Sequence, residues 1–69
     1  MINETVGIIG GTGWLGGSIA KAMLAKGLLP AANLVISNRS GNHPLAQQGA
    51  CLVADNQDLV DRSDVVVLA

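Results

Sequence analysis

A glycine-rich stretch near the N-terminus constrains the fold of this chain more than any other part of the sequence. The stretch reads Gly10-Gly11-Thr12-Gly13-Trp14-Leu15-Gly16. It follows the short apolar run 5–9 and opens the amphipathic segment 14–26. An apolar run, a glycine turn and an amphipathic segment in this order predict a strand that leads through a turn into a helix.

The glycines of this turn have separate physical roles. Gly11 can adopt the tight turn, Gly13 lets the backbone approach a ligand because it has no Cβ, and Gly16 lets the helix pack close to the strand. The first turn of the helix then presents unpaired N–H groups and the positive end of the helix dipole. These groups suit a pyrophosphate, so the stretch predicts a dinucleotide-binding site.

Helix and strand patterns alternate along the rest of the chain. In the first helix the apolar stripe expected to face the core consists of Leu15, Ile19, Ala22 and Met23. A connection over 28–33 follows. We then expect strands over 34–37, 50–53 and 65–69, the last of them buried, and helices over 44–48 and 56–62. Pro44 can start the second helix and Asp55 can cap the third. These short helical crossovers predict a Rossmann-like α/β fold with a parallel sheet in the order 3-2-1-4.

Chain length limits how much of such a fold can be present. The chain has 69 residues, whereas a dinucleotide-binding fold normally needs about twice that length. Trp14 is the only aromatic residue, so the core is aliphatic and small for independent stability. We therefore interpret residues 1–69 as one unit, an incomplete N-terminal dinucleotide-binding domain of a longer protein.

Composition argues against several classes of function. The net charge is −1 and the four basic residues are scattered, which does not suit a nucleic-acid or anionic-membrane surface. The single cysteine, Cys51, rules out an internal disulfide and fits the reducing cytoplasm, where we expect the protein; we interpret it as a small buried residue on a strand. No apolar run approaches the roughly 20 residues that span a bilayer, and no signal peptide is apparent.

The residues after the second strand indicate which nucleotide binds. In a dinucleotide fold the end of this strand meets the adenine ribose, and NAD sites usually place Asp or Glu there. This chain has Ser37-Asn38-Arg39-Ser40 at that point and no carboxylate. The guanidinium of Arg39 can pair with a 2′-phosphate, which a carboxylate would repel. We therefore predict NADP(H) in preference to NAD(H); the alternative is that Arg39 is a solvated turn residue.

Few other side chains have a chemical character that suggests a role. Asn56 follows the third strand at the edge where ligands of such sheets bind, and it either contacts the ligand or only begins a helix. His43 has no partner at catalytic or metal-binding spacing, so we expect a surface turn residue. The four aspartates between 55 and 64 fit a capped, solvated helix rather than acid–base machinery. We predict no catalytic residue and no metal site in this chain.

Several stretches together resemble the N-terminal domain of pyrroline-5-carboxylate reductases, over essentially all 69 residues. They are Val6–Gly10, the glycine stretch, Gly27–Pro30, Ser37–Ser40, Asn56 and Ser63–Ala69. Such reductases use NAD(P)H to reduce the cyclic imine of pyrroline-5-carboxylate to proline. The resemblance implies a C-terminal helical domain, absent from this chain, that holds the substrate and forms a homo-oligomer.

The resemblance also implies which residues bind the cofactor. The residues around the pyrophosphate would be Gly10, Gly11, Thr12, Gly13, Trp14, Leu15 and Gly16. Those around the 2′-phosphate would be Asn38, Arg39 and Ser40. Asn56 would contact the adenosine side, and the backbone of Ala69 would lie near the nicotinamide.

The glycine stretch departs from the usual Gly-x-Gly-Asn-Met-Ala of these reductases, with Trp14 in place of an amide side chain. Its Gly-Gly-Thr-Gly form looks more like prephenate dehydrogenases or coenzyme F420-dependent NADP reductases, and Gly10, Gly13 and Gly16 also satisfy the pattern of short-chain dehydrogenases and epimerases. Trp14 is either a packing residue that covers the loop or a cofactor contact. Two other classes stay open: a non-catalytic dinucleotide-sensing module, and a structural fold that never binds nucleotide.

Overall fold

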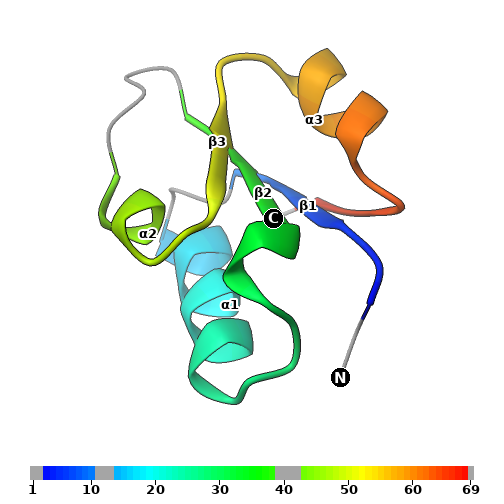
Figure 1. The fold of residues 1–69 in the computed structure, drawn as a ribbon. Helices are drawn as coiled ribbons and strands as arrows, with labels where there is room; N and C mark the ends of the chain where they lie inside the picture. The colour runs from blue at the N-terminus through cyan, green and yellow to red at the C-terminus, as the bar shows by residue number, and fades with distance from the viewer. Residues whose placement is uncertain (1–2, 11–13, 39–42, 69) are drawn as a thin grey trace.

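Four short strands pair in parallel in the computed structural model of the chain, which describes residues 3–10, 14–38 and 43–68 (Figure 1). They are β1 (Val6–Ile9), β2 (Leu34–Ser37), β3 (Cys51–Val53) and β4 (Val65–Leu68). The order in the sheet is β3-β2-β1-β4, and Val6 lies beside both Leu34 and Val65. The predicted parallel sheet and its order are confirmed.

The helices that connect these strands cover both faces of the sheet. They are α1 (Trp14–Ala25), the 3₁₀ helix η1 (Ala31–Asn33), α2 (Pro44–Gln47) and α3 (Asn56–Arg62). α1 and α2 pack on one face and α3 packs on the other (Figure 1). The expected ends of the strands and α-helices differ from the observed ones by at most one residue, and η1 lies inside the expected connection 28–33.

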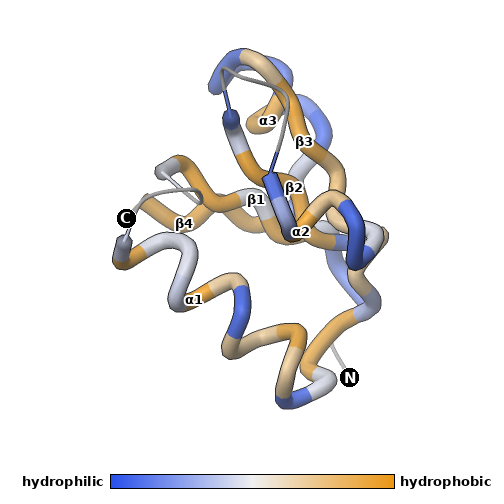
Figure 2. Tube along the Cα trace, turned by 90° about the vertical axis from the view of Figure 1, so that its left-hand side faces the viewer, coloured by the Kyte–Doolittle hydropathy of each residue, from blue (hydrophilic) through white to orange (hydrophobic). Residues whose placement is uncertain are grey.

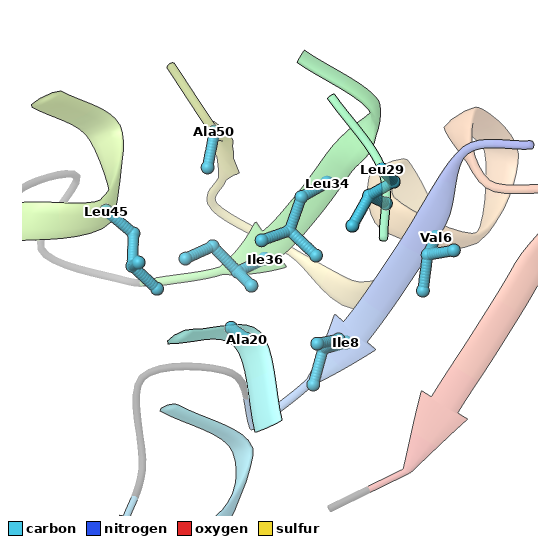
Figure 3. Packing of buried hydrophobic residues seen from close by; sticks show 8 residues of the cluster. All are labelled: Val6, Ile8, Ala20, Leu29, Leu34, Ile36, Leu45 and Ala50. Atoms are coloured by element: carbon cyan, nitrogen blue, oxygen red, sulfur yellow. The ribbon is translucent and has the colours of Figure 1, made fainter. Parts of the chain in front are cut away.

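The main core lies between the sheet and α1. Because side chains alternate along a strand, Val6 and Ile8 of β1 point to the same face as Leu34 and Ile36 of β2. The cluster is completed by Ala20, Leu29, Leu45 and Ala50 (Figure 3). Figure 2 shows the apolar residues concentrated along the strands, and this buried aliphatic layer holds α1 and α2 in place.

The face that α1 turns to the sheet agrees only in part with the predicted one. The buried residues of the helix are Gly16, Gly17 and Ala20. Of the predicted stripe, Leu15 is 54% exposed and Ala22 is exposed, while Ile19 and Met23 lie half-buried beside the core. The buried positions of the helix are therefore its smallest residues, which allow a close approach of the helix to its neighbours.

A second, smaller core lies under α3. Leu59 packs there against Val35 and Val53. Gly7 of β1 allows this packing: a Cβ at Gly7 would collide with Ser63 Oγ and lie 2.6 Å from Leu59 Cδ2. The close approach of α3 to β1 therefore depends on the absence of a side chain at one position of the strand.

The expectation that the last strand is buried is wrong. Val66 of β4 is 38% exposed and Leu68 is 79% exposed, whereas Val67 is half-buried against the main core. β4 pairs with β1 along one edge, and the described helices cover β1 and β2 rather than β4. The apolar composition of this strand therefore does not translate into burial.

None of the described helices combines the length and the apolar character needed to cross a membrane.

Candidate functional site

The strands of a parallel sheet all end at the same edge, and the predicted ligand residues follow these ends. β1 ends at Ile9, β2 at Ser37 and β3 at Val53. Ser37 lies directly beside Val53 in the register, and the N–H of Asn38 donates to the carbonyl oxygen of Val53 over 2.8 Å. In sheets of this kind ligands bind at the carboxyl ends of the strands, so this edge is the candidate site.

Gly10 makes the turn that follows β1. Its φ of 84° lies in the left-handed region, which glycine adopts without the steric penalty of a side chain. The sequence had suggested Gly11 for the tight turn; the structure shows that Gly10, directly after the strand, already requires glycine. Gly11, Thr12 and Gly13 lie outside the described residues.

α1 begins at Trp14, within the glycine stretch, and directs its N-terminus towards this edge (Figure 1). The helix has 12 residues, so its first turn offers unpaired N–H groups and the positive end of a helix dipole. Gly16 is one of the buried residues of the helix, which is consistent with the close packing predicted for the third glycine of the stretch. A strand, a left-handed glycine and the start of a helix therefore stand in the order that a phosphate-binding turn needs.

Trp14 and Leu15 are the first two residues of α1, and both side chains are exposed. Trp14 is 89% exposed, the largest fraction among the exposed large apolar residues of the described chain. This exposure differs from the interpretation of Trp14 as a packing residue, because no described residue covers the indole. A role of Trp14 and Leu15 in cofactor binding stays a prediction.

The residues predicted to surround the 2′-phosphate follow β2. Ser37 and Asn38 are half-buried at the end of the strand, where the backbone of Asn38 is bonded to β3. Arg39 and Ser40 lie outside the described residues, as does Ala69, the residue expected near the nicotinamide. Asn38, the first residue of the predicted 2′-phosphate segment, thus lies at the candidate edge, and its contact with the cofactor stays a prediction.

Asp55 and Asn56 occupy the corresponding position after β3. The Asp55 carboxylate accepts a hydrogen bond from the N–H of Asp58 over 2.7 Å, which confirms the predicted cap of α3. Asn56 is the first residue of the helix and is exposed, so its side chain is accessible from the edge. Its contact with the adenosine side stays a prediction.

His43 has a structural role that the sequence analysis missed. Its Nδ1 accepts a hydrogen bond from the N–H of Leu45 over 3.2 Å, so the imidazole caps α2. We had expected a surface turn residue. The signal was the Pro44 that follows, because proline favours the first position of a helix and thereby makes the preceding residue the cap.

The charged side chains on α3 form ordinary surface contacts. Arg62 donates from Nε to Asp58 over 2.7 Å, and this hydrogen bond together with the charge of Asp58 raises the pKa of Arg62. Cys51 is half-buried rather than buried, and its Sγ lies 3.8 Å from an Arg62 guanidinium nitrogen. Among the described residues no group of three His, Cys, Asp or Glu side chains could hold a metal ion.

Comparison with known proteins identifies the family. A family model described as NADP oxidoreductase coenzyme F420-dependent matches residues 5–69. This N-terminal domain family is shared by pyrroline-5-carboxylate reductases. A search of curated proteins finds no match.

Proposed function

The chain belongs to the coenzyme F420-dependent NADP oxidoreductase family, and from this premise we propose that it binds NADP(H) for a reductase acting on a C=N bond. The membership itself makes the chain the dinucleotide-binding domain of an NADP-dependent oxidoreductase. Three further points are parts of the proposal: that the enzyme reduces a C=N bond, that it prefers NADP(H) to NAD(H), and which residues bind the cofactor.

One observation carries the proposed cofactor site: Gly10, at φ 84°, stands between the end of β1 and the start of α1. The left-handed φ favours glycine at this turn. Because glycine has no Cβ, the backbone there can approach a pyrophosphate closely. The N–H groups at the start of α1 donate to phosphate oxygens there, and the helix dipole favours the negative charge.

We assign the choice between NADP(H) and NAD(H) to the residues that follow β2. Asn38 follows the strand with its backbone N–H held by Val53, and Arg39 and Ser40 are the next residues in the chain. The Arg39 guanidinium would pair with the 2′-phosphate that only NADP(H) carries, while Asn38 and Ser40 supply neutral donors. Asn56, at the start of α3, would contact the adenosine side.

Pyrroline-5-carboxylate is the substrate that the sequence resemblance supports. The bound cofactor supplies a hydride, which would add to the imine carbon while the nitrogen takes up a proton, giving proline. We assign substrate binding and homo-oligomer formation to a C-terminal helical domain outside this chain. The chain's own part in the reaction is then to bind and orient the cofactor.

A second candidate function follows from the glycine stretch. Gly10-Gly11-Thr12-Gly13 looks more like the form found in coenzyme F420-dependent NADP reductases, and the description of the matching family names that coenzyme. Such an enzyme would exchange a hydride between NADP(H) and the deazaflavin of F420 rather than reduce an imine.

The two candidates are separated by assaying the full-length protein with each acceptor. NADPH oxidation is followed at its nicotinamide absorbance, first with pyrroline-5-carboxylate and then with oxidised coenzyme F420. We expect turnover with the imine. Turnover with F420 alone would replace the imine assignment by the second candidate, and NADPH binding without turnover on either acceptor would favour a dinucleotide-sensing module.

A further inference from the structure

Leu45 connects α2 to the main core and to the next strand of the sheet. Its side chain has no exposed surface, and in Figure 3 it points towards Ile36 of β2. Its carbonyl oxygen accepts hydrogen bonds from the N–H groups of Gln48 over 3.1 Å and of Ala50 over 3.2 Å. Ala50 directly precedes β3, which has three residues and lies at one edge of the sheet. The position of Leu45 therefore fixes α2 and the start of an edge strand together.

The acceptor for the N–H of Leu45 is the imidazole of His43. Pro44 occupies the first position of α2 and has no N–H, so the N–H of Leu45 is the first in the helix that needs an acceptor. His43 Nδ1 accepts from it over 3.2 Å. A ring nitrogen that accepts a hydrogen bond carries no proton, whereas the imidazolium has a proton on both nitrogens and can only donate. This cap therefore exists only with the neutral form of the ring.

The elements that share the main core with α2 bring few titratable side chains to this region. Among them α2 itself, β1, β2 and β4 carry none. The lysines of α1 and of the residue after it, Lys21 and Lys26, are both exposed, and Cys51 of β3 packs with the smaller core on the opposite face. No ion pair of the described residues includes His43, which is the only histidine of the sequence.

We propose that His43 is a pH-sensitive cap, whose protonation releases α2 and loosens the start of β3. Histidine changes its charge between about pH 5 and pH 8, whereas carboxylates and lysines titrate outside this range. The cap is complete at the upper end of the range and is lost as the pH falls. Because the uncapped state binds an additional proton, acid favours it. The switch lies in the fold itself and does not depend on the proposed cofactor site.

Hydrogen exchange of backbone amides in the full-length protein, measured without cofactor at about pH 7.5 and about pH 5, tests this cap. The protection factor corrects for the intrinsic pH dependence of exchange. It should fall about fivefold at the lower pH for the Leu45 and Ala50 amides, which is of the order that the loss of a helix cap causes.

The amide of Asp58 is the matched control in the same measurement. It donates to the Asp55 carboxylate over 2.7 Å and so reports a cap on α3, on the other face of the sheet. Its protection should stay the same, because carboxylates titrate at lower pH than histidine.

His43→Ser is the control variant, because a hydroxyl accepts from the same N–H and does not titrate in this range. Its Leu45 and Ala50 amides should keep the same protection at both pH values. Equal protection at both pH values in the unmodified protein, or an equal fall in His43→Ser, would overturn the switch. A fall confined to Leu45 would overturn the link to β3. Failure to bind either nicotinamide cofactor would instead overturn the proposed function and leave these results unaffected.

Discussion

Gly10 and Gly27 share a backbone conformation but not a location. Their φ angles are 84° and 65°, both in the left-handed region. Gly10 follows β1 at the candidate cofactor edge, whereas Gly27 follows α1 and an added Cβ there would meet nothing within 4 Å. The pair therefore separates the conformational penalty of a side chain from an effect on ligand binding.

We expect Gly10→Ala and Gly27→Ala each to lower the free energy of unfolding by about 1–2 kcal/mol, the penalty of an L-residue in the left-handed region. Only Gly10→Ala should also weaken NADPH binding, since it alone alters the proposed phosphate turn. Urea unfolding and fluorescence titration with NADPH measure the two effects. Equal NADPH affinity in both variants would contradict the role of Gly10.

Arg39→Ala should lower NADPH affinity by about tenfold to a hundredfold, because a hydrogen bond to a charged group contributes about 1.5–3 kcal/mol. NADH affinity should change little. Arg62→Ala is the control, since the Arg62 side chain is bonded to Asp58 on α3. An unchanged NADPH/NADH ratio in Arg39→Ala, measured by titration of the full-length protein, would show that Arg39 is a solvated turn residue.

Residue types alone predicted roles correctly where the role depends on the local backbone. Asp55 was expected to cap α3 and does so, because a cap needs only an acceptor directly before the helix. His43 was missed because histidine is an uncommon cap and only the geometry shows its Nδ1 facing the N–H of Leu45. The exposure of Trp14 was not predictable either, since it depends on which segments pack nearby.

At the scale of elements, the packing of α3 on β1 depends on a single position. Ser63 Oγ donates to the carbonyl oxygen of Leu59 over 2.6 Å, and this last part of the helix region lies directly over Gly7. β1 and α3 can therefore move apart only by loosening the smaller core around Leu59. Since α3 carries Asn56 at its other end, its position also bears on the candidate site.

Gly7→Ala should lower the free energy of unfolding by about 1–3 kcal/mol, as expected for an added methyl group in a tightly packed interior. Ser63→Ala removes one of the two colliding groups, so the double variant should lose less than the sum of the two single losses. The midpoints of urea unfolding for the four proteins measure this coupling. Strictly additive losses would contradict the contact between Gly7 and Ser63.

The face of α1 shows why hydropathy patterns alone can mislead at this scale. The sequence favoured Leu15, Ile19, Ala22 and Met23 because a periodicity argument ranks side chains by their apolar character. The structure buries Gly16, Gly17 and Ala20, packs Ile19 and Met23 partly against the core and leaves Leu15 and Ala22 exposed. How closely the helix can approach the sheet decides which of its faces is buried. This distance depends on the strands opposite the helix, and the periodicity of the helix sequence carries no information about those strands.

At the scale of the whole molecule, the sheet is covered unevenly. Both helix layers lie over β1 and β2, while β4 exposes most of its apolar side chains. Parallel sheets are normally covered on both faces, which is why the apolar strand was expected to be buried. Burial of a strand, however, depends on what packs against it and not on its composition.

We expect residues 1–69 expressed alone to give no turnover of pyrroline-5-carboxylate with NADPH. The proposed substrate pocket belongs to another domain, and the predicted residues of this chain bind cofactor only. The full-length protein is the positive control in the same spectrophotometric assay. Measurable turnover by the isolated chain would place substrate binding within these residues and refute the division of roles.

The sequence by itself determined the order of strands and helices, the parallel sheet and the cap at Asp55, because these follow from local periodicity, turn residues and right-handed crossovers. Only the tertiary structure decided which face of α1 is buried, that β4 is exposed, that Gly10 is left-handed and that His43 caps α2. These features depend on distances between segments remote in sequence or on single dihedral angles. A one-dimensional pattern does not specify either.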